Sequence, residues 1–189
     1  MVKTIHYRVG QFVRALTARV PEKELEQVIH ILTPKARALF RLQDIQYQHH
    51  VLAVYHTLRQ AGHTNPHLLA AALLHDVGKV DARLPAWLRA IIVLLERFAP
   101  RLLAHLGLDE SQGRGQSLPG GWRRSFVVHI HHPEIGARYA HEAGCSPLTV
   151  ALIRRHQDKL SKDAPRNEAA PHNEEDRLLA ALQAADNLN

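Results

Sequence analysis

The chain has 189 residues and a formal net charge of +6, with 46% apolar and 22% charged residues. This length suits one domain with a buried core, and the single cysteine, Cys145, excludes an internal disulfide and favours an intracellular, cytoplasmic location. No apolar run in the chain is long enough to cross a membrane.

The first part of the chain, residues 1–42, is expected to form two or three helices. Thr33 is a suitable N-cap for the last of them, and Pro34 suits its first helical position. A second amphipathic segment predicts a helix over residues 44–61 that ends at Gly62.

The next predicted helix begins after Asn65-Pro66 and runs to about Val77. Seven consecutive apolar residues precede His75, so this helix should lie inside the protein. Gly78 follows it and is predicted to take the left-handed cap position.

The second half of the chain alternates helical segments with polar ones. An amphipathic stretch over 85–106 is interrupted by Pro100, and the segments 109–121 and 161–173 are polar and are expected to be loops. Further helices are predicted over 122–132, 133–143, 147–158 and 174–187. We see no strand alternation, so the predicted fold is an all-α helical bundle with two polar loops.

The predicted organisation is one compact domain in two parts. Residues 1–43 form N-terminal helices that pack on the core, and residues 44–189 form the domain that carries the chemistry. Residues 82–121 are an insertion in that domain, with an amphipathic helix and a loop.

Histidine is unusually frequent, with 15 residues in the chain. The pair His75-Asp76 ends the apolar helix, where burying a carboxylate beside an imidazole is costly without a bound metal or matched hydrogen bonds. The alternative is that Asp76 only reaches solvent at the helix end. His50 shares a helix face with Val54 and Leu58, whereas His49 lies on a more polar face.

Three further residues, His132, His156 and Asp186, also interrupt apolar helix faces. Each alone could be a hydrogen-bonded core residue. Together with His50 and the His75-Asp76 pair they form an imidazole and carboxylate set without thiolate, which suits iron, manganese, cobalt, zinc or magnesium. The core of a helical bundle is a usual place for such a centre.

The order His50, then Leu-Leu-His-Asp-Val-Gly-Lys over 73–79, then Ala-Asp at 185–186 resembles the H…HD…D signature of the HD superfamily of phosphohydrolases. The strings His-Pro-Glu-Ile-Gly-Ala over 132–137 and Ile-Arg-Arg-His over 153–156 resemble further histidine motifs of members that hold two metals, such as bacterial diadenosine-tetraphosphate hydrolases. The resemblance covers residues 44–188, apart from 85–121.

The resemblance implies an HD-type bundle that cleaves a phosphate ester or anhydride of a nucleotide or related small molecule with metal-activated water. It implies one metal on His50, His75, Asp76 and Asp186, and a second on His132 and His156 with Asp76 bridging. If the last two histidines are not ligands, the site holds one metal.

The same resemblance assigns catalytic roles to Asp76, His75 and Lys79. Lys79, Arg138 and Arg155 are the candidate contacts for substrate phosphate. The alternative for Lys79 is a solvated lysine at a helix end, and for each arginine a surface ion pair.

Two other interpretations stay open at this stage. One is a metal-binding, nucleotide-sensing or protein-interaction module without turnover. The other concerns residues 86–106, which are more apolar than one buried stripe needs and could contact a membrane surface or a second copy; they could also pack on the N-terminal helices. Without an aromatic platform or a concentrated basic stripe, we do not expect nucleic-acid binding.

Overall fold

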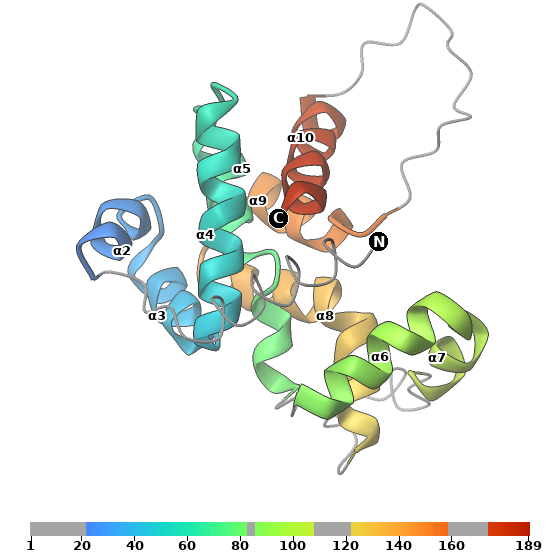
Figure 1. Cartoon of the computed structure of the whole chain (residues 1–189). Helices are drawn as coiled ribbons and strands as arrows, with labels where there is room; N and C mark the ends of the chain where they lie inside the picture. Colours follow the sequence, from blue (N-terminus) through green and yellow to red (C-terminus); the bar gives the residue numbers. More distant parts are fainter. Residues whose placement is uncertain (1–21, 83–85, 108–121, 159–173) are drawn as a thin grey trace, which may run out of the picture.

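A computed structural model of the chain describes residues 22–82, 86–107, 122–158 and 174–189 (Figure 1). Within these ranges helices are the only regular secondary structure, which confirms the all-α prediction for this part of the chain. The predicted loops over 109–121 and 161–173 lie outside the described residues.

The first four described helices are α2 (Glu22–Ile29), α3 (Pro34–Leu42), α4 (Ile45–Gln60) and α5 (Pro66–Leu74). The predicted starts are confirmed by the caps: the Thr33 hydroxyl accepts the Ala36 N–H of α3. In the same way the side chain of Asn65 accepts two backbone N–H groups at the start of α5.

The end of α5 differs from the prediction. The helix stops at Leu74, His75 is its C-cap, and a short 3-10 helix, η1 (Val77–Asp81), follows. Gly78 lies inside η1 and is not one of the described glycines with a positive φ, so its predicted role as a left-handed cap was wrong. A Cβ atom at Gly78 would lie 2.1 Å from the carbonyl oxygen of His132, so the glycine is needed for close packing.

The remaining helices are α6 (Ala86–Phe98), α7 (Pro100–Leu106), α8 (Arg123–Glu142), α9 (Pro147–Arg155) and α10 (Glu174–Leu188). The prediction of two helices over 122–132 and 133–143 was wrong, because α8 continues through Pro133. A proline inside a helix usually costs about 3 kcal/mol and leaves one carbonyl without its N–H partner.

Helix α5 lies at the centre of the bundle, where α3, α4, α9 and α10 contact it (Figure 1). All seven residues from Leu68 to Leu74 are buried, which confirms the prediction of an interior helix. The main hydrophobic core also takes side chains from α2 and α3, including Val28 and Phe40.

A smaller hydrophobic cluster joins α6 and α7 to α8. It contains Leu88, Ile92, Leu103 and Phe126, so the described part of the 86–106 segment packs on α8. In Figure 1 these two helices extend beyond the bundle as an arm. Among the described helices, none combines the length and apolar character needed to cross a bilayer.

Candidate metal centre

Five helical segments deliver histidine and aspartate side chains to one point in the bundle. In the first group of potential ligands, His50 comes from α4 and His75-Asp76 from the end of α5. In the second group, Asp76 is joined by His132 from α8 and His156 from the end of α9. Within each group the potential ligand atoms all lie within 4.8 Å of one another, and Asp76 belongs to both.

The first group has a second carboxylate at its edge. Asp186 on α10 places Oδ1 2.9 Å from His50 Nε2 and 3.5 Å from His75 Nε2. The Nε2 atoms of His50 and His75 lie 4.0 and 3.8 Å from the carboxylate oxygens of Asp76. The structure therefore brings together all four residues that were predicted to share one metal.

The second group is more deeply buried. Nε2 of His132 lies 3.4 Å and Nε2 of His156 4.0 Å from Oδ1 of Asp76, and the two Nε2 atoms are 3.3 Å apart. The side chains of both histidines are at most 1% exposed. Asp76 lies between the two groups, as expected of a residue that contacts two cations.

Three of the imidazole rings are oriented in the same way. His75, His132 and His156 each donate a hydrogen bond from Nδ1 to the backbone carbonyl three residues earlier, at 3.0, 2.6 and 2.7 Å. A carbonyl can only accept, so Nδ1 carries a proton in each ring. In the neutral ring this leaves the lone pair on Nε2, which is the nitrogen that faces the centre.

The carbonyls that orient these rings are available because the helices are interrupted there. Ala72 and Ile153 lie in the last turns of α5 and α9, where carbonyls have no partner within the helix. The His129 carbonyl lies four residues before Pro133, which has no N–H to donate. The interior proline of α8 thus leaves a free acceptor for His132.

The carboxylate of Asp76 is kept ionised by its neighbours. Burial favours its neutral form, but Lys79, with Nζ 2.8 Å from both carboxylate oxygens, and His75 outweigh this and hold the pKa of Asp76 well below its usual range. Asp76 in turn raises the pKa of Lys79 against the effect of burial, so the ammonium stays charged.

The two carboxylates of the first group create an electrostatic environment that favours a positive charge. Burial opposes protonation of His75, but Asp76 and Asp186 outweigh it and raise the pKa of this histidine. Burial favours the neutral form of Asp186, but the neighbouring imidazoles of His50 and His75 outweigh this and lower its pKa. A divalent cation at this point would be stabilised by the same two carboxylates.

The second group favours neutral imidazoles. Burial lowers the pKa of His132, and burial together with the neighbouring His75 and His132 lowers the pKa of His156 to about 3. Both rings are therefore neutral near pH 7, which is the form that binds a metal.

Some buried nitrogen atoms of these histidines lack a hydrogen-bond partner, and a bound cation would provide one interaction for each. Nε2 of His75 is buried and has no hydrogen-bond partner, and the Nε2 lone pairs of His132 and His156 face each other. Unpaired buried polar atoms are uncommon in folded proteins and are costly. The residues present therefore fit a divalent cation in each group.

Two glutamines hold the helix ends that carry His75 and His156. Gln43 donates to the Leu73 carbonyl at the end of α5, and Gln183 donates to the His156 carbonyl at the end of α9. No sequence pattern predicts these contacts, because each joins residues about 30 positions apart in the chain.

A second set of contacts holds η1 against α8. Tyr139 donates a hydrogen bond to the Asp81 carboxylate, and Arg124 binds both the carbonyl and the carboxylate of Asp81. Because η1 directly follows Asp76, these contacts position the shared carboxylate relative to His132. They join residues 58 and 43 positions apart, so no local sequence pattern predicts them.

The candidate phosphate-binding residues lie in three different settings. Lys79 is at the centre, on Asp76, with a side chain that is 18% exposed. Arg138 is exposed on α8 and lies over the ring of Tyr139. Arg155 forms ion pairs with Glu175 and Asp176 of α10, so its guanidinium links α9 to α10.

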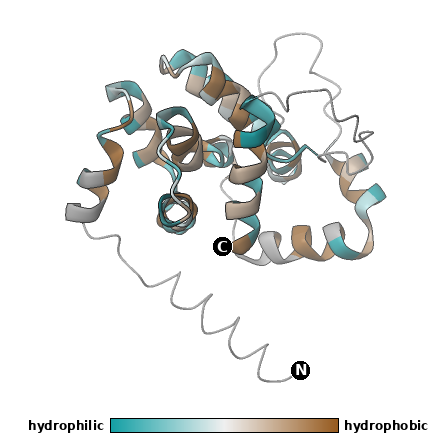
Figure 2. Cartoon of the chain, turned by 90° about the horizontal axis from the view of Figure 1, so that it is seen from above, coloured by the Kyte–Doolittle hydropathy of each residue, from teal (hydrophilic) through white to brown (hydrophobic). Residues whose placement is uncertain are grey.

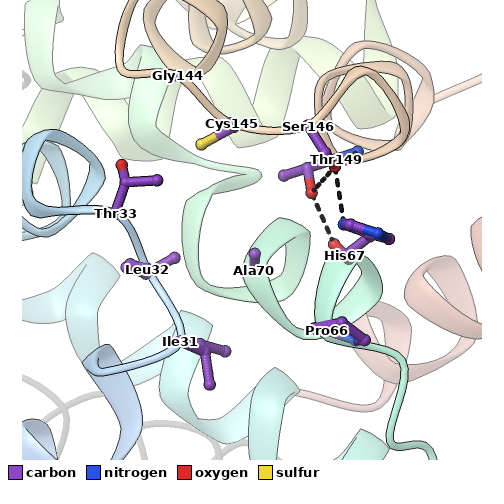
Figure 3. Close-up of a pocket in the computed structure, with 10 residues that line it drawn as sticks. All are labelled: Ile31, Leu32, Thr33, Pro66, His67, Ala70, Gly144, Cys145, Ser146 and Thr149. Atoms are coloured by element: carbon purple, nitrogen blue, oxygen red, sulfur yellow. Dashed lines mark hydrogen bonds between the residues drawn. The ribbon is translucent and has the colours of Figure 1, made fainter.

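The cavity of about 210 Å³ in Figure 3 lies away from this centre and includes none of its candidate ligands. Ser146 Oγ lies 2.8 Å from His67 Nδ1, which resembles a nucleophile beside a base. The same oxygen accepts the Thr149 N–H as the cap of α9, and the Thr149 hydroxyl donates to the His67 carbonyl. The group therefore joins the starts of α5 and α9.

The chain was compared with models of known protein families, with curated proteins and with solved structures. None of the three comparisons found a match.

Proposed function

We propose that the chain is a metal-dependent phosphohydrolase of the HD type that cleaves a phosphate ester or anhydride of a nucleotide or related small molecule. The observation that carries this proposal is the shared position of Asp76 between two histidine groups. The order of these residues along the chain is the order expected from the resemblance to the HD superfamily.

In this proposal His50, His75, Asp76 and Asp186 hold one divalent cation. His132 and His156 hold a second together with Asp76. Imidazole and carboxylate ligands without thiolate suit iron, manganese, cobalt, zinc or magnesium. Such cations lower the pKa of bound water and neutralise charge on phosphoryl oxygens.

The protein itself orients the ligands and leaves one side open to substrate. The side chains of His75, His132 and His156 are at most 1% exposed, whereas those of His50 and Asp186 are 26% and 30% exposed. A phosphate group would therefore approach along the side formed by α4 and α10.

Lys79 supplies a fixed positive charge at the same place. Its ammonium stays protonated because the adjacent Asp76 raises its pKa, and its side chain is partly exposed. A cation beside the ligand set would attract an anionic substrate and would stabilise the charge on a phosphoryl group. Arg138 and Arg155 are less central in the structure, and the proposal does not depend on them.

The experiment is a hydrolysis screen of the full chain, loaded separately with each of the five metals, against nucleoside mono-, di- and triphosphates and dinucleoside polyphosphates. Asp76→Asn keeps the side-chain shape but removes the charge shared by both groups, so we expect activity to be lost. His49→Ala changes the neighbour of His50 on α4, and we expect it to stay active.

A metal-loaded wild-type protein that is inert toward every substrate class would contradict the proposal. That result would favour a metal-binding, nucleotide-sensing module. Binding of a nucleotide without its hydrolysis would then identify such a module.

A further inference from the structure

The arm formed by α6 and α7 has two different faces. One face is buried: Leu88, Ile92 and Leu103 pack against α8 in the smaller core cluster. Outside this buried face, large apolar side chains are left in solvent: Phe98 is 76%, Val93 61%, Leu94 55%, Leu102 49% and Ile91 38% exposed. Figure 2 shows hydrophobic segments along this arm at the edge of the molecule.

The exposed apolar residues follow helical spacing. Ile91, Leu94 and Phe98 stand at positions i, i+3 and i+7, so they form one stripe along α6. This stripe is separate from the one that packs on α8. Five large apolar side chains gathered on one short arm differ from the scattered exposed leucines found elsewhere, such as Leu42 and Leu188.

Two arginines lie beside the apolar stripe. Arg97 and Arg101 are exposed, four residues apart in sequence, and neither forms an ion pair with any residue in the described part of the chain. Arg97 instead stands over the ring of Phe98. Long arginine side chains can keep the guanidinium at a polar boundary while their stems cover apolar surface.

We propose that the exposed apolar stripe of this arm, Ile91, Leu94 and Phe98, together with the exposed Leu102 of α7 and the arginines Arg97 and Arg101, docks on an anionic lipid surface. Helix α6 has 13 residues, too few to cross a bilayer, which needs about 20. It would therefore lie in the plane of the interface, with the apolar stripe among the acyl chains and the arginines at the headgroup phosphates.

A second copy of the chain fits the face less well. In a symmetric dimer the same patch faces itself, so the two arginines of each copy would be gathered into one interface. Like charges placed across an interface oppose association. Lipid phosphates complement both arginines, and the net charge of +6 favours approach to an anionic surface.

The test is co-sedimentation of the full chain with vesicles of equal parts phosphatidylcholine and phosphatidylglycerol, at low and high salt, beside vesicles of phosphatidylcholine alone. We expect binding to the mixed vesicles at low salt that weakens as salt is added. Leu94→Ser/Phe98→Ser should lose this binding. The control Leu42→Ser/Leu188→Ser removes two exposed leucines elsewhere, 66% and 78% exposed, and should bind like the wild type.

A second pair of variants tests the charge. Arg97→Gln/Arg101→Gln should weaken partition by about fivefold for each arginine, since each basic residue near an anionic surface contributes about 1 kcal/mol. Lys35→Gln/Arg59→Gln lowers the net charge equally but away from the arm, and it should bind more tightly than the arm variant.

Three results would overturn the proposal: no binding of the wild type to mixed vesicles at low salt, equal binding by both serine variants, or equal binding by both glutamine variants. A dimer that Leu94→Ser/Phe98→Ser dissociates, without lipid binding, would identify a second copy as the occupant instead.

Discussion

The Nε2 atoms of His132 and His156 lie 3.3 Å apart, while the Nδ1 atom of each ring donates to a backbone carbonyl. In the neutral rings both Nε2 atoms carry lone pairs, so nothing between them forms a hydrogen bond. Two lone pairs at this distance repel each other, whereas a cation beside both would be bound by both. This relationship, with Asp76 at 3.4 Å from His132, is the geometric basis for proposing a second metal position.

The two halves of the centre can be separated by mutation. His132→Ala removes a ligand from the second group only, and His50→Ala removes one from the first group only. We expect each variant to retain one fewer equivalent of metal than the wild type by elemental analysis, and Asp76→Asn to lose both. His49→Ala is the control. If His132→Ala and His50→Ala both keep the wild-type stoichiometry, neither group binds metal.

Pro133 is predicted to act on the metal through His132. Pro133→Ala restores an N–H that can bond the His129 carbonyl, which now accepts from His132 Nδ1. We expect α8 to become more stable, by up to about 3 kcal/mol, while metal affinity falls about tenfold, because partners that orient a ligand typically contribute 10- to 100-fold. Thermal unfolding and calorimetric titration measure the two effects.

The control for this change is Pro147→Ala at the first position of α9, where no ligand depends on the missing N–H. Its metal affinity should match the wild type. An unchanged affinity in Pro133→Ala as well would show that His132 is oriented by other contacts.

Gly78 is predicted to be essential for the packing of η1 on α8. In Gly78→Ala the new Cβ would meet backbone atoms of His132 and Gly136, which cannot move aside as a flexible side chain can. We expect a loss of at least about 1–3 kcal/mol in the free energy of unfolding, together with weaker metal binding, because η1 follows Asp76 directly.

Gly62→Ala is a comparison variant that is expected to destabilise the protein for a different reason. Gly62 has open space around its Cβ position but a φ of +86°, so alanine there costs about 1–2 kcal/mol of backbone strain without touching the centre. Denaturant unfolding should show a lower free energy of unfolding in both variants than in the wild type. Metal retention should fall only in Gly78→Ala, and equal retention in the two would contradict the role assigned to Gly78.

The stability of the metal-free protein should depend on His156. Its pKa is about 3 when folded, against the usual 6.5. Between these two pH values the unfolded chain binds a proton that the folded chain does not, so the free energy of unfolding falls as pH falls. The slope from this residue is about 1.4 kcal/mol per pH unit. His132 acts in the same direction, whereas His75, whose pKa is raised, has its effect above pH 6.5, where it makes the free energy of unfolding fall as pH rises.

Denaturant unfolding in chelator, for the wild type and for His156→Asn, isolates this contribution. The wild type should lose stability more steeply than the variant as pH falls below 6.5. Parallel curves would mean that His156 has an ordinary pKa in the folded protein.

The sequence was sufficient for the local features of the fold. Thr33-Pro34 and Asn65-Pro66 predicted helix starts correctly because a cap is a contact between near neighbours. The apolar stripe of α4 also placed His50, rather than His49, beside the His75-Asp76 pair.

The errors fell where distant segments meet. Gly78 was predicted to be a cap, but the structure uses it for the close approach of α8. Pro133 was predicted to end a helix, but α8 continues through it, and the carbonyl that it frees accepts from the adjacent ligand. Gln43 and Gln183 act on helix ends 30 and 27 residues away, so no local pattern reveals them.

The most direct test of the metal centre is elemental analysis of the purified full chain after reconstitution with each candidate metal and removal of the excess. The two groups that share Asp76 predict two equivalents per chain for at least one divalent metal. One equivalent at most would contradict the bridging role of Asp76, and a chain that retains none would contradict the metal centre itself.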